Sequence, residues 1–449
     1  MSKEILEEKF PVAFPDKVKK GWENTAKGLY TKNAIPGLYM LDIEHINDDI
    51  VLKHNDPNEP ECVATLYRKA ICIHNCPFCF NEENLVYSQY KRGLDGQVIT
   101  GESTPPEINR IMTTEETFAV IDQAVEIAHA EGHDFEYVKF LGPGELLMSP
   151  QLFEIIDLYA ERKVHFCIFT KGALLGSDEL AQKYQGMNAR ELVDALAACD
   201  SISLLFSFQS FDPGVQNSLV TSVNEKGDTK GLQDYTALRD KALEYVFESA
   251  FYQNSTTDRL CMINAPIVPE NLEESYDIYT FFVERGTPIF MTPSMVSGKG
   301  CGQVERQRET MSEKEWGERI IELYAKIYVY NVRKGVQTDE QIKREGIAAY
   351  AGCTPCNQAA VGLYIRANGI VQICPGRFDK ETIYGNVLTT PLREIWERSP
   401  NRARGIINPH TLVNNRCPAK DGRVFLPGFY EKVLQQYEQL MLEEVMVPL

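Results

Sequence analysis

The sequence predicts an α/β fold: a partial (β/α)6 TIM-like barrel followed by a small C-terminal domain with its own cysteines. Two observations lead to this prediction. Between about residue 60 and residue 300, short apolar segments typical of strands alternate with longer segments of helical spacing. The chain of 449 residues is also long enough for more than one domain and a large core. Barrels of this type carry their chemistry on the loops that follow the strands.

The individual strand–helix units follow from local patterns. Thr113 and Glu116 form a capping box that starts the first long helix. Further upstream, Tyr39–Ile43 and Ile50–His54 alternate between apolar and polar residues, and this pattern predicts a hairpin. The predicted barrel strands are Val63–Tyr67, Tyr137–Leu141, His165–Thr170, Ile202–Ser207, Leu260–Pro266 and Ile289–Thr292, and the predicted helices between them include 151–162, 190–198, 236–249 and 271–285.

Composition and charge exclude several function classes. The net charge of −18 argues against nonspecific nucleic-acid binding, which needs a basic face. The first ten residues, MSKEILEEKF, lack the apolar segment of a secretory signal. No apolar run approaches the ~20 residues that span a bilayer. We therefore expect a cytoplasmic protein that does not interact with a membrane.

The chain contains twelve cysteines, and in a cytosolic protein this number favours metal ligands over disulfides. Three of them, Cys72, Cys76 and Cys79, have the spacing C-x3-C-x2-C within the segment 71–84, ICIHNCPFCFNEEN. Three thiolates can hold three irons of one [4Fe–4S] cube and leave the fourth iron open to a small chelating molecule. A zinc knuckle or buried cysteines are the alternative, although zinc sites prefer paired C-x2-C arms and four ligands.

With Phe78 directly before the third cysteine, this spacing resembles the signature of the radical S-adenosylmethionine (radical SAM) enzymes. A second motif, Gly142-Pro143-Gly144-Glu145, follows the next predicted strand and is similar to the Gly-Gly-Glu-Pro motif of that family. It departs from the family at Pro143 and at the position after Glu145. The resemblance implies that Glu145 binds the ammonium group of SAM and that the two glycines allow close backbone approach.

The residues at two further predicted strand ends resemble those of the family. Thr170-Lys171-Gly172 is similar to the Thr-Asn-Gly turn after the third strand, with Lys171 in place of Asn, and we interpret it as structural. Ser207 and Gln209 share one side of the next strand because side chains alternate. The resemblance places a polar residue here against SAM, so we predict a contact by Ser207. Its alternative is a hydroxyl bonded only to backbone.

A second set of cysteines follows the barrel. The pair Gly369 and Cys374 (G-x4-C), together with Gly385-Asn386 and Ile395-Trp396, resembles the SPASM extension or its shorter twitch form. The resemblance implies one auxiliary [4Fe–4S] cluster, and structural zinc is the alternative. If Cys417, the last cysteine of the chain, does not bind, a cluster held by only three cysteines can bind substrate directly. The four predicted ligands are Cys353, Cys356, Cys374 and Cys417.

These patterns divide the chain into five predicted segments. The remaining cysteines are interpreted as core, except Cys301, which is either a small buried residue or a thiol on the substrate side. Lys299, in the same loop, can face a carboxylate. The predicted segments are an N-terminal extension (1–58), the barrel (59–302), a helical bridge (303–345), the auxiliary-cluster domain (346–430) and a C-terminal helix (431–449).

The resemblance also implies the chemistry. A radical SAM enzyme reductively cleaves SAM to a 5′-deoxyadenosyl radical, which takes a hydrogen atom from the substrate, and an electron donor such as a flavodoxin or ferredoxin supplies the electron. We expect a small-molecule substrate such as a sugar, a nucleotide or an amino-acid derivative, because the N-terminal segment is short and one auxiliary cluster is predicted. The alternatives are a peptide- or protein-modifying maturase and a non-enzymatic iron–sulfur or zinc scaffold. The turn at Glu145 argues against the scaffold.

Overall fold

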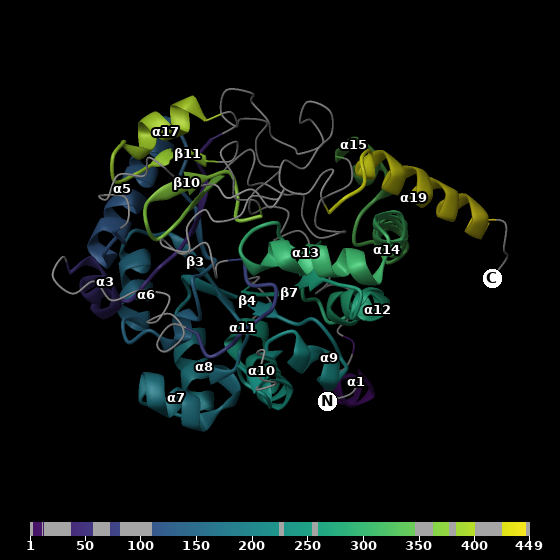
Figure 1. The fold of residues 1–449 in the computed structure, drawn as a ribbon, viewed down its shortest axis with the longest axis horizontal. Helices are drawn as coiled ribbons and strands as arrows, with labels where there is room; N and C mark the ends of the chain where they lie inside the picture. Colours follow the sequence, from purple (N-terminus) through teal and green to yellow (C-terminus); the bar gives the residue numbers. More distant parts are fainter. Residues whose placement is uncertain are drawn as a thin grey trace.

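The computed structural model places six parallel strands in the order in which they follow one another along the chain (Figure 1). Within the full sheet of nine strands the order is β11-β10-β9-β1-β2-β3-β4-β7-β8. The structure describes residues 3–10, 12, 37–56, 72–80, 110–223, 229–253, 259–345, 362–376, 383–399 and 424–445. The six parallel strands are β1 (Met40–Ile43), β2 (Tyr137–Phe140), β3 (His165–Thr170), β4 (Ile202–Ser207), β7 (Leu260–Ile267) and β8 (Ile289–Pro293).

Helices connect these strands, and the arrangement confirms the predicted partial barrel. The capping box is present, because Thr113 Oγ1 accepts the Glu116 N–H at 3.2 Å and Glu116 Oε2 accepts the Thr113 N–H at 3.0 Å. The connecting helices are α5 (Thr114–Ala130), α6 (Leu152–Glu161), α7 (Asp178–Gln185), α8 (Ala189–Ala197), α9 (Pro213–Ser218), α10 (Tyr235–Glu248), α11 (Ala250–Gln253) and α12 (Leu272–Val283). Shorter elements are α1 (Lys3–Lys9), η3 (Leu146–Met148), η4 (Leu174–Gly176), β5 (Ser222–Val223) and β6 (Thr229–Lys230).

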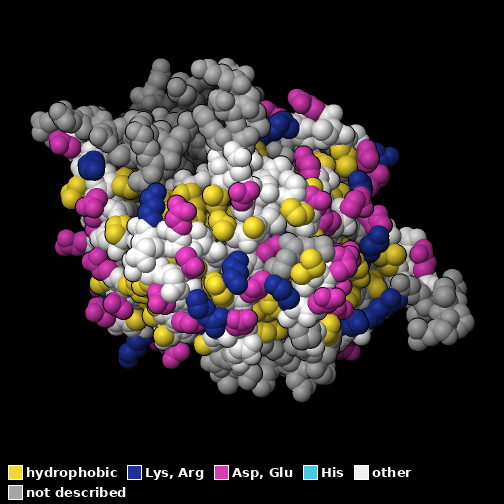
Figure 2. All heavy atoms as spheres, turned by 90° about the horizontal axis from the view of Figure 1, so that it is seen from below, with side chains coloured by type: hydrophobic (Ala, Val, Ile, Leu, Met, Phe, Trp, Pro, Cys, Tyr) yellow, Lys and Arg dark blue, Asp and Glu magenta, His cyan; other side chains and the backbone are white. Residues whose placement is uncertain are grey.

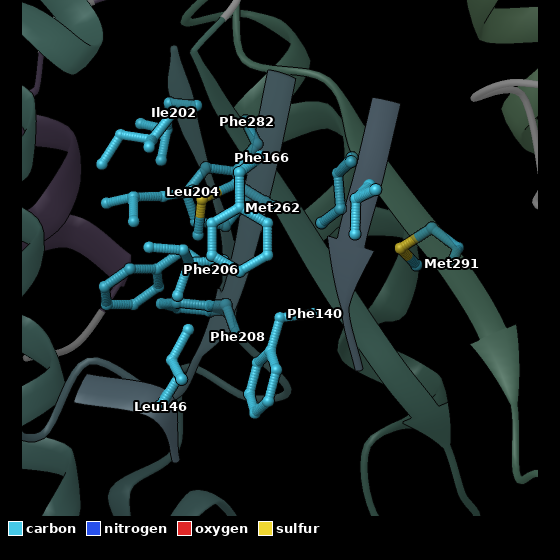
Figure 3. Close-up of a cluster of buried hydrophobic side chains, with 14 of the residues drawn as sticks. Phe140, Leu146, Phe166, Ile202, Leu204, Phe206, Phe208, Met262, Phe282 and Met291 are labelled. Atoms are coloured by element: carbon cyan, nitrogen blue, oxygen red, sulfur yellow. The ribbon is translucent and has the colours of Figure 1, made fainter. Parts of the chain in front are cut away.

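The main core lies between the sheet and these helices (Figure 3). Alternate residues of each strand point toward the helices, so this face of the sheet is buried under them and excluded from water. Burying one such large side chain contributes roughly 1.5–3 kcal/mol. This core holds the strand ends, and the loops that follow them, in place. Its central members are Phe140, Phe166, Ile202, Leu204, Phe206, Met262, Phe282 and Met291.

The predicted N-terminal hairpin is wrong, because its second arm is the helix α3 (Asp48–Asn55). Asn47 caps this helix by accepting the Asp49 N–H on Oδ1 at 2.8 Å, and the two aspartates in the first turn suit the positive end of the helix dipole. The first arm is β1, which pairs with β2 and is the first of the six strands along the chain. The strand predicted at Val63–Tyr67 lies outside the described residues.

The C-terminal part extends the same sheet. Strand β9 (Gly362–Ile365) pairs in parallel with β1, and the antiparallel strands β10 (Ile370–Gln372) and β11 (Ile383–Asn386) follow. Glu44, directly after β1, is 2% exposed and accepts the Ala367 N–H at 2.8 Å as well as the Tyr364 hydroxyl. The two predicted domains therefore share one sheet, and their boundaries stay a prediction.

Helices complete this side of the molecule. The predicted helical bridge consists of α13 (Lys299–Thr310), α14 (Glu313–Arg333) and α15 (Asp339–Glu345). Helix α17 (Leu392–Arg398) packs on α5, where Trp396 Nε1 donates to Glu131 Oε1 at 3.0 Å. The C-terminal helix α19 (Phe429–Val445) lies along α14 (Figure 1).

The surface is mixed in charge. On the face drawn in Figure 2, acidic and basic side chains of the described residues alternate, and hydrophobic side chains are scattered among them. In the part of the chain that the structure describes, no helix has both the length and the apolar character needed to cross a membrane.

Candidate active site

The cysteine segment 72–80 lies at the edge of the sheet where the parallel strands end. The N–H of Asn75 donates to the Val220 carbonyl, beyond β4, at 2.9 Å. The Phe78 ring lies 5.4 Å from the Nζ of Lys171, which directly follows β3. The structure thus brings the predicted cysteine loop to the edge where barrels carry their chemistry.

The thiol of Cys72 lies within electrostatic range of the other two thiols and of Glu145. Burial raises the pKa of Cys72 well above its ordinary value, and the neighbouring Cys76, Cys79 and Glu145 raise it further. Three anionic thiolates beside a carboxylate need a compensating positive charge, and the irons of a cluster supply it. The donor set therefore fits the predicted [4Fe–4S] cube.

Within the described residues, no three His, Cys, Asp or Glu side chains converge tightly enough to hold a single metal ion. A cube does not need such convergence, because each thiolate binds a different iron. The arrangement of Cys72, Cys76 and Cys79 is therefore compatible with the predicted [4Fe–4S] cluster.

Glu145 is 4% exposed, and its carboxylate is only half satisfied. The Thr170 hydroxyl and the Lys171 N–H donate to Oε2 at 3.1 and 3.2 Å. Oε1 is buried, and no donor among the described residues reaches it. Burial raises the pKa of Glu145 to about 7, against the lowering effect of the hydrogen bonds. A carboxylate with one satisfied and one unsatisfied oxygen fits the ammonium group of SAM.

Two glycines shape the turn that delivers Glu145. Gly142 and Gly144 have φ angles of 104° and 91°, in the left-handed region that side chains with a Cβ rarely adopt. The two glycines thus allow the backbone to make this turn, and the turn accommodates the proline between them.

Lys171 belongs to the turn that the sequence led us to interpret as structural, and its side chain contacts Ser207. It is 8% exposed, and its Nζ donates to Ser207 Oγ at 3.3 Å. Ser207 is fully buried and also accepts from Gln209 Nε2. The Ser207 hydroxyl thus accepts from two side chains, and its contact with SAM stays a prediction. The signal for Lys171 was present in the sequence as a cation at a position where the family has Asn.

Of the second cysteine set, the described residues include Cys374, which is half-buried after β10 and packs near Tyr384. The accompanying motif residues do meet. Gly369 (φ 79°) turns the chain so tightly that an added Cβ would lie 2.6 Å from Asn386 Oδ1. Asn386 in turn donates to the Asn368 carbonyl at 2.9 Å and accepts the Leu388 N–H at 2.8 Å. The other predicted ligands, Cys353, Cys356 and Cys417, lie outside the described residues.

The remaining cysteines differ in how far they are buried and in whether the structure describes them. Cys167 is buried, as predicted for a core residue, whereas Cys199 and Cys261 are partly exposed. Cys301 belongs to α13, and its side chain lies outside what the structure describes, as does Cys62.

Comparison with known proteins supports the C-terminal assignment. Residues 356–419 match the family model of SPASM, an iron-sulfur cluster-binding domain. No curated protein matches the chain.

Several solved structures share parts of its arrangement. "Native anSMEcpe with bound AdoMet" is 11% identical, with 91% of this chain and 98% of that chain covered and a TM-score of 0.48. SuiB of Streptococcus suis bound to S-adenosylmethionine is 13% identical, with 82% and 67% covered and a TM-score of 0.42. The same protein bound to its precursor peptide SuiA gives 12% identity, 82% and 66% coverage and a TM-score of 0.43. At these TM-scores, the likeness does not by itself define an activity.

The family match covers residues 356–419, and the site before them is described by the chain's own residues. The C-x3-C-x2-C segment lies at the carboxyl edge of a parallel sheet, and a half-satisfied buried carboxylate lies beside its first thiol. A matched iron–sulfur domain follows in the same chain. Residues 356–419 are therefore similar to the SPASM iron–sulfur cluster-binding domain, and the cysteine segment resembles the radical SAM signature in its spacing.

Proposed function

We propose that Cys72, Cys76 and Cys79 hold the cluster that activates SAM, and that Glu145 and Lys171 bind the two ends of the amino-acid part of SAM. The unpartnered Oε1 of Glu145 carries this proposal. When bound, the cluster and SAM supply one-electron reduction and a radical that abstracts a hydrogen atom. The protein residues hold the reactants and exclude water.

Glu145 is suited to an ammonium ion for two reasons. Its Oε2 is already fixed by Thr170 and Lys171, so the carboxylate has one defined orientation. The free energy of burying its charge is uncompensated on the Oε1 side, and a donated N–H from a cation offsets this cost. Bound ammonium also stabilises the ionised form, because an opposite charge lowers the pKa of a carboxyl.

Lys171 is suited to the carboxylate of SAM. Its ammonium lies between the Ser207 hydroxyl and the face of Phe78, so it is oriented by contacts from two separate segments. The backbone of Lys171 is fixed as well, since the Tyr235 hydroxyl donates to its carbonyl at 2.8 Å. A cation held in this way at about 3 Å from a carboxylate forms a charge-assisted hydrogen bond.

For the substrate, we propose a peptide or protein side chain in place of the small molecule expected at first. The expectation of a small molecule rested on the short N-terminal segment and on the single predicted auxiliary cluster. The match of residues 356–419 to SPASM favours the peptide, because the resemblance associates this extension mostly with peptide-modifying maturases. A low-potential one-electron donor of the flavodoxin or ferredoxin class is the second proposed partner.

One experiment tests both the chemistry and the substrate class. The protein is reconstituted with iron and sulfide, reduced in the presence of SAM, and mixed with an extract from cells grown in deuterated medium. The extract is separated by size into a polypeptide fraction and a metabolite fraction. We expect a brown protein with about eight irons, release of 5′-deoxyadenosine, and deuterium in that product only with the polypeptide fraction. Transfer from the metabolite fraction alone would overturn the peptide assignment, and a colourless protein that releases no 5′-deoxyadenosine would overturn the function itself.

A further inference from the structure

The loop after β8 contacts both cysteine sets. We call its residues 296–300, with the sequence Val-Ser-Gly-Lys-Gly, the connector. The connector leads from the last barrel strand into α13, which crosses the middle of the molecule in Figure 1. Nothing in its sequence alone indicates that it links two distant segments.

On one side the connector holds the cysteine segment 72–80. The Lys299 N–H donates to the Cys79 carbonyl at 2.9 Å, and Lys299 Nζ donates to Asn75 Oδ1 at 2.9 Å. About two turns further along α13, Arg306 Nη2 donates to the Pro77 carbonyl at 3.2 Å. Three bonds from one short stretch therefore fix the segment that contains Cys76 and Cys79.

On the other side the connector holds the segment that follows Cys374. The Val296 N–H donates to the Gly376 carbonyl, and Ser297 Oγ donates to the Pro375 carbonyl, both at 2.8 Å. Val296 and Ser297 are 2% and 1% exposed, so water does not compete for these bonds. Gly298 is the single residue between Ser297, which donates on this side, and Lys299, which donates on the other.

The two connector glycines make this close double contact possible. Gly298 has φ 56° and ψ −140°, a backbone conformation that residues with a Cβ rarely adopt. An added Cβ on Gly300 would lie 2.2 Å from the Met295 carbonyl oxygen. The chain can therefore turn at Gly298, so that Ser297 donates to one cysteine segment and Lys299 donates to the other.

We propose that the connector is a rigid link that sets the position of the Cys72–Cys79 cluster relative to the auxiliary cluster, with Ser297 and Lys299 as positioning residues. The proposal rests on the proposed function, because it takes Cys79 and Cys374 as ligands. Ser297 bonds to the segment on the auxiliary side, and Lys299 bonds to the segment on the SAM side. Loosening either end frees one cluster with respect to the other.

Lys299 has a second, electrostatic effect. Its ammonium is bonded to Asn75, which lies one residue before Cys76. A positive charge beside a cluster stabilises the reduced form, which carries one more electron, so it raises the reduction potential. Loss of the Lys299 charge is therefore expected to lower the potential of the SAM-side cluster and to leave that of the auxiliary cluster unchanged.

Pulsed EPR on the protein with both clusters reduced measures the distribution of distances between them. We expect Ser297→Ala to broaden this distribution, whereas Ser294→Ala, a buried serine on the same loop, leaves it as in the unaltered protein. Hydrogen exchange supplies a second measurement: in Ser297→Ala the peptide that covers residues 72–80 should exchange faster, although the removed hydroxyl donates to the Pro375 carbonyl and not to that segment. If Ser297→Ala changes neither measurement, the rigid link is overturned.

A potentiometric titration followed by EPR tests the charge effect. We expect Lys299→Met to lower the reduction potential of the SAM-side cluster and Lys299→Arg to restore it. Lys314→Met, at an exposed position beyond the far end of the 12-residue α13, makes the same change in net charge where solvent and salt screen it. Equal potentials in Lys299→Met and Lys314→Met would overturn the role of Lys299. An unaltered protein that binds no cluster at Cys72, Cys76 and Cys79 would instead overturn the proposed function.

Discussion

Glu145 Oε2 accepts the backbone N–H of Lys171 at 3.2 Å, so the residues that follow two neighbouring strands, β2 and β3, are tied together at the edge of the sheet. This bond orients the carboxylate and at the same time fixes the backbone from which the Lys171 ammonium extends. An acid and a base are thereby held side by side, next to the thiols of the cysteine segment. Their pairing matches the ammonium and carboxylate groups of one amino acid.

Replacing Glu145 by Gln should weaken SAM binding. The amide removes the negative charge beside Oε1 while its size is nearly unchanged. A hydrogen bond to a charged group contributes about 1.5–3 kcal/mol, so we expect affinity to fall about 10- to 100-fold. Equilibrium dialysis of the reconstituted protein with labelled SAM measures the change. Glu154→Gln, at an exposed position on α6, is the matched control, and equal affinities in the two variants would contradict the assignment.

The affinity for SAM should depend on pH in a defined direction. The pKa of Glu145 is raised to about 7, so protonation below that pH removes the ammonium partner, and affinity should fall by up to about tenfold per pH unit. In the protein without SAM the sign is opposite. The raised pKa stabilises the fold below about 4.5, and this contribution is lost as pH rises through 7. Glu145→Gln should abolish both slopes, and an unchanged acid limb in that variant would point to another group.

Replacing Lys171 by Met should also lower SAM affinity, by about tenfold, because the charge-assisted bond to the carboxylate is lost. Lys171→Arg keeps the charge and should recover part of the affinity. Lys183→Met, on the exposed side of α7, controls for the change in net charge. Iron content should stay the same in all three variants, because Lys171 is not a cluster ligand. A Lys171→Met protein with full affinity would show that the carboxylate binds elsewhere.

Removing Cys374 should remove one cluster and spare the other. Iron analysis and visible absorption of reconstituted Cys374→Ala should show a loss of about four irons from about eight. Cys199→Ala, which removes another partly exposed thiol, should keep the full content. The same iron content in Cys374→Ala, with zinc present in the unaltered protein, would favour the structural-zinc alternative.

Glu44→Ala should destabilise the junction between the barrel strands and the C-terminal strands. The change leaves the buried Tyr364 hydroxyl and the Ala367 N–H without their acceptor, and it removes the buried carboxylate 3.6 Å from Arg366. Breaking such a network costs about 3 kcal/mol. The urea midpoint, followed by circular dichroism, should fall, while Glu126→Ala on the exposed face of α5 should leave it nearly unchanged. A small shift in Glu44→Ala would show that the two parts do not depend on this contact.

Local patterns in the sequence determined much of this protein. The spacing of Cys72, Cys76 and Cys79, the capping box at Thr113 and five of the six barrel strands are encoded within a few residues, where periodicity and turn chemistry act. The tertiary structure decided what depends on contacts between distant segments. It showed that β1 lies between β9 and β2, because pairing with these two strands outweighs the local hairpin pattern. It also brought Lys171 to Ser207 and joined Cys79 to the Cys374 segment through residues 296–300, since hydrogen bonds between residues tens to hundreds of positions apart leave no periodic trace in the chain.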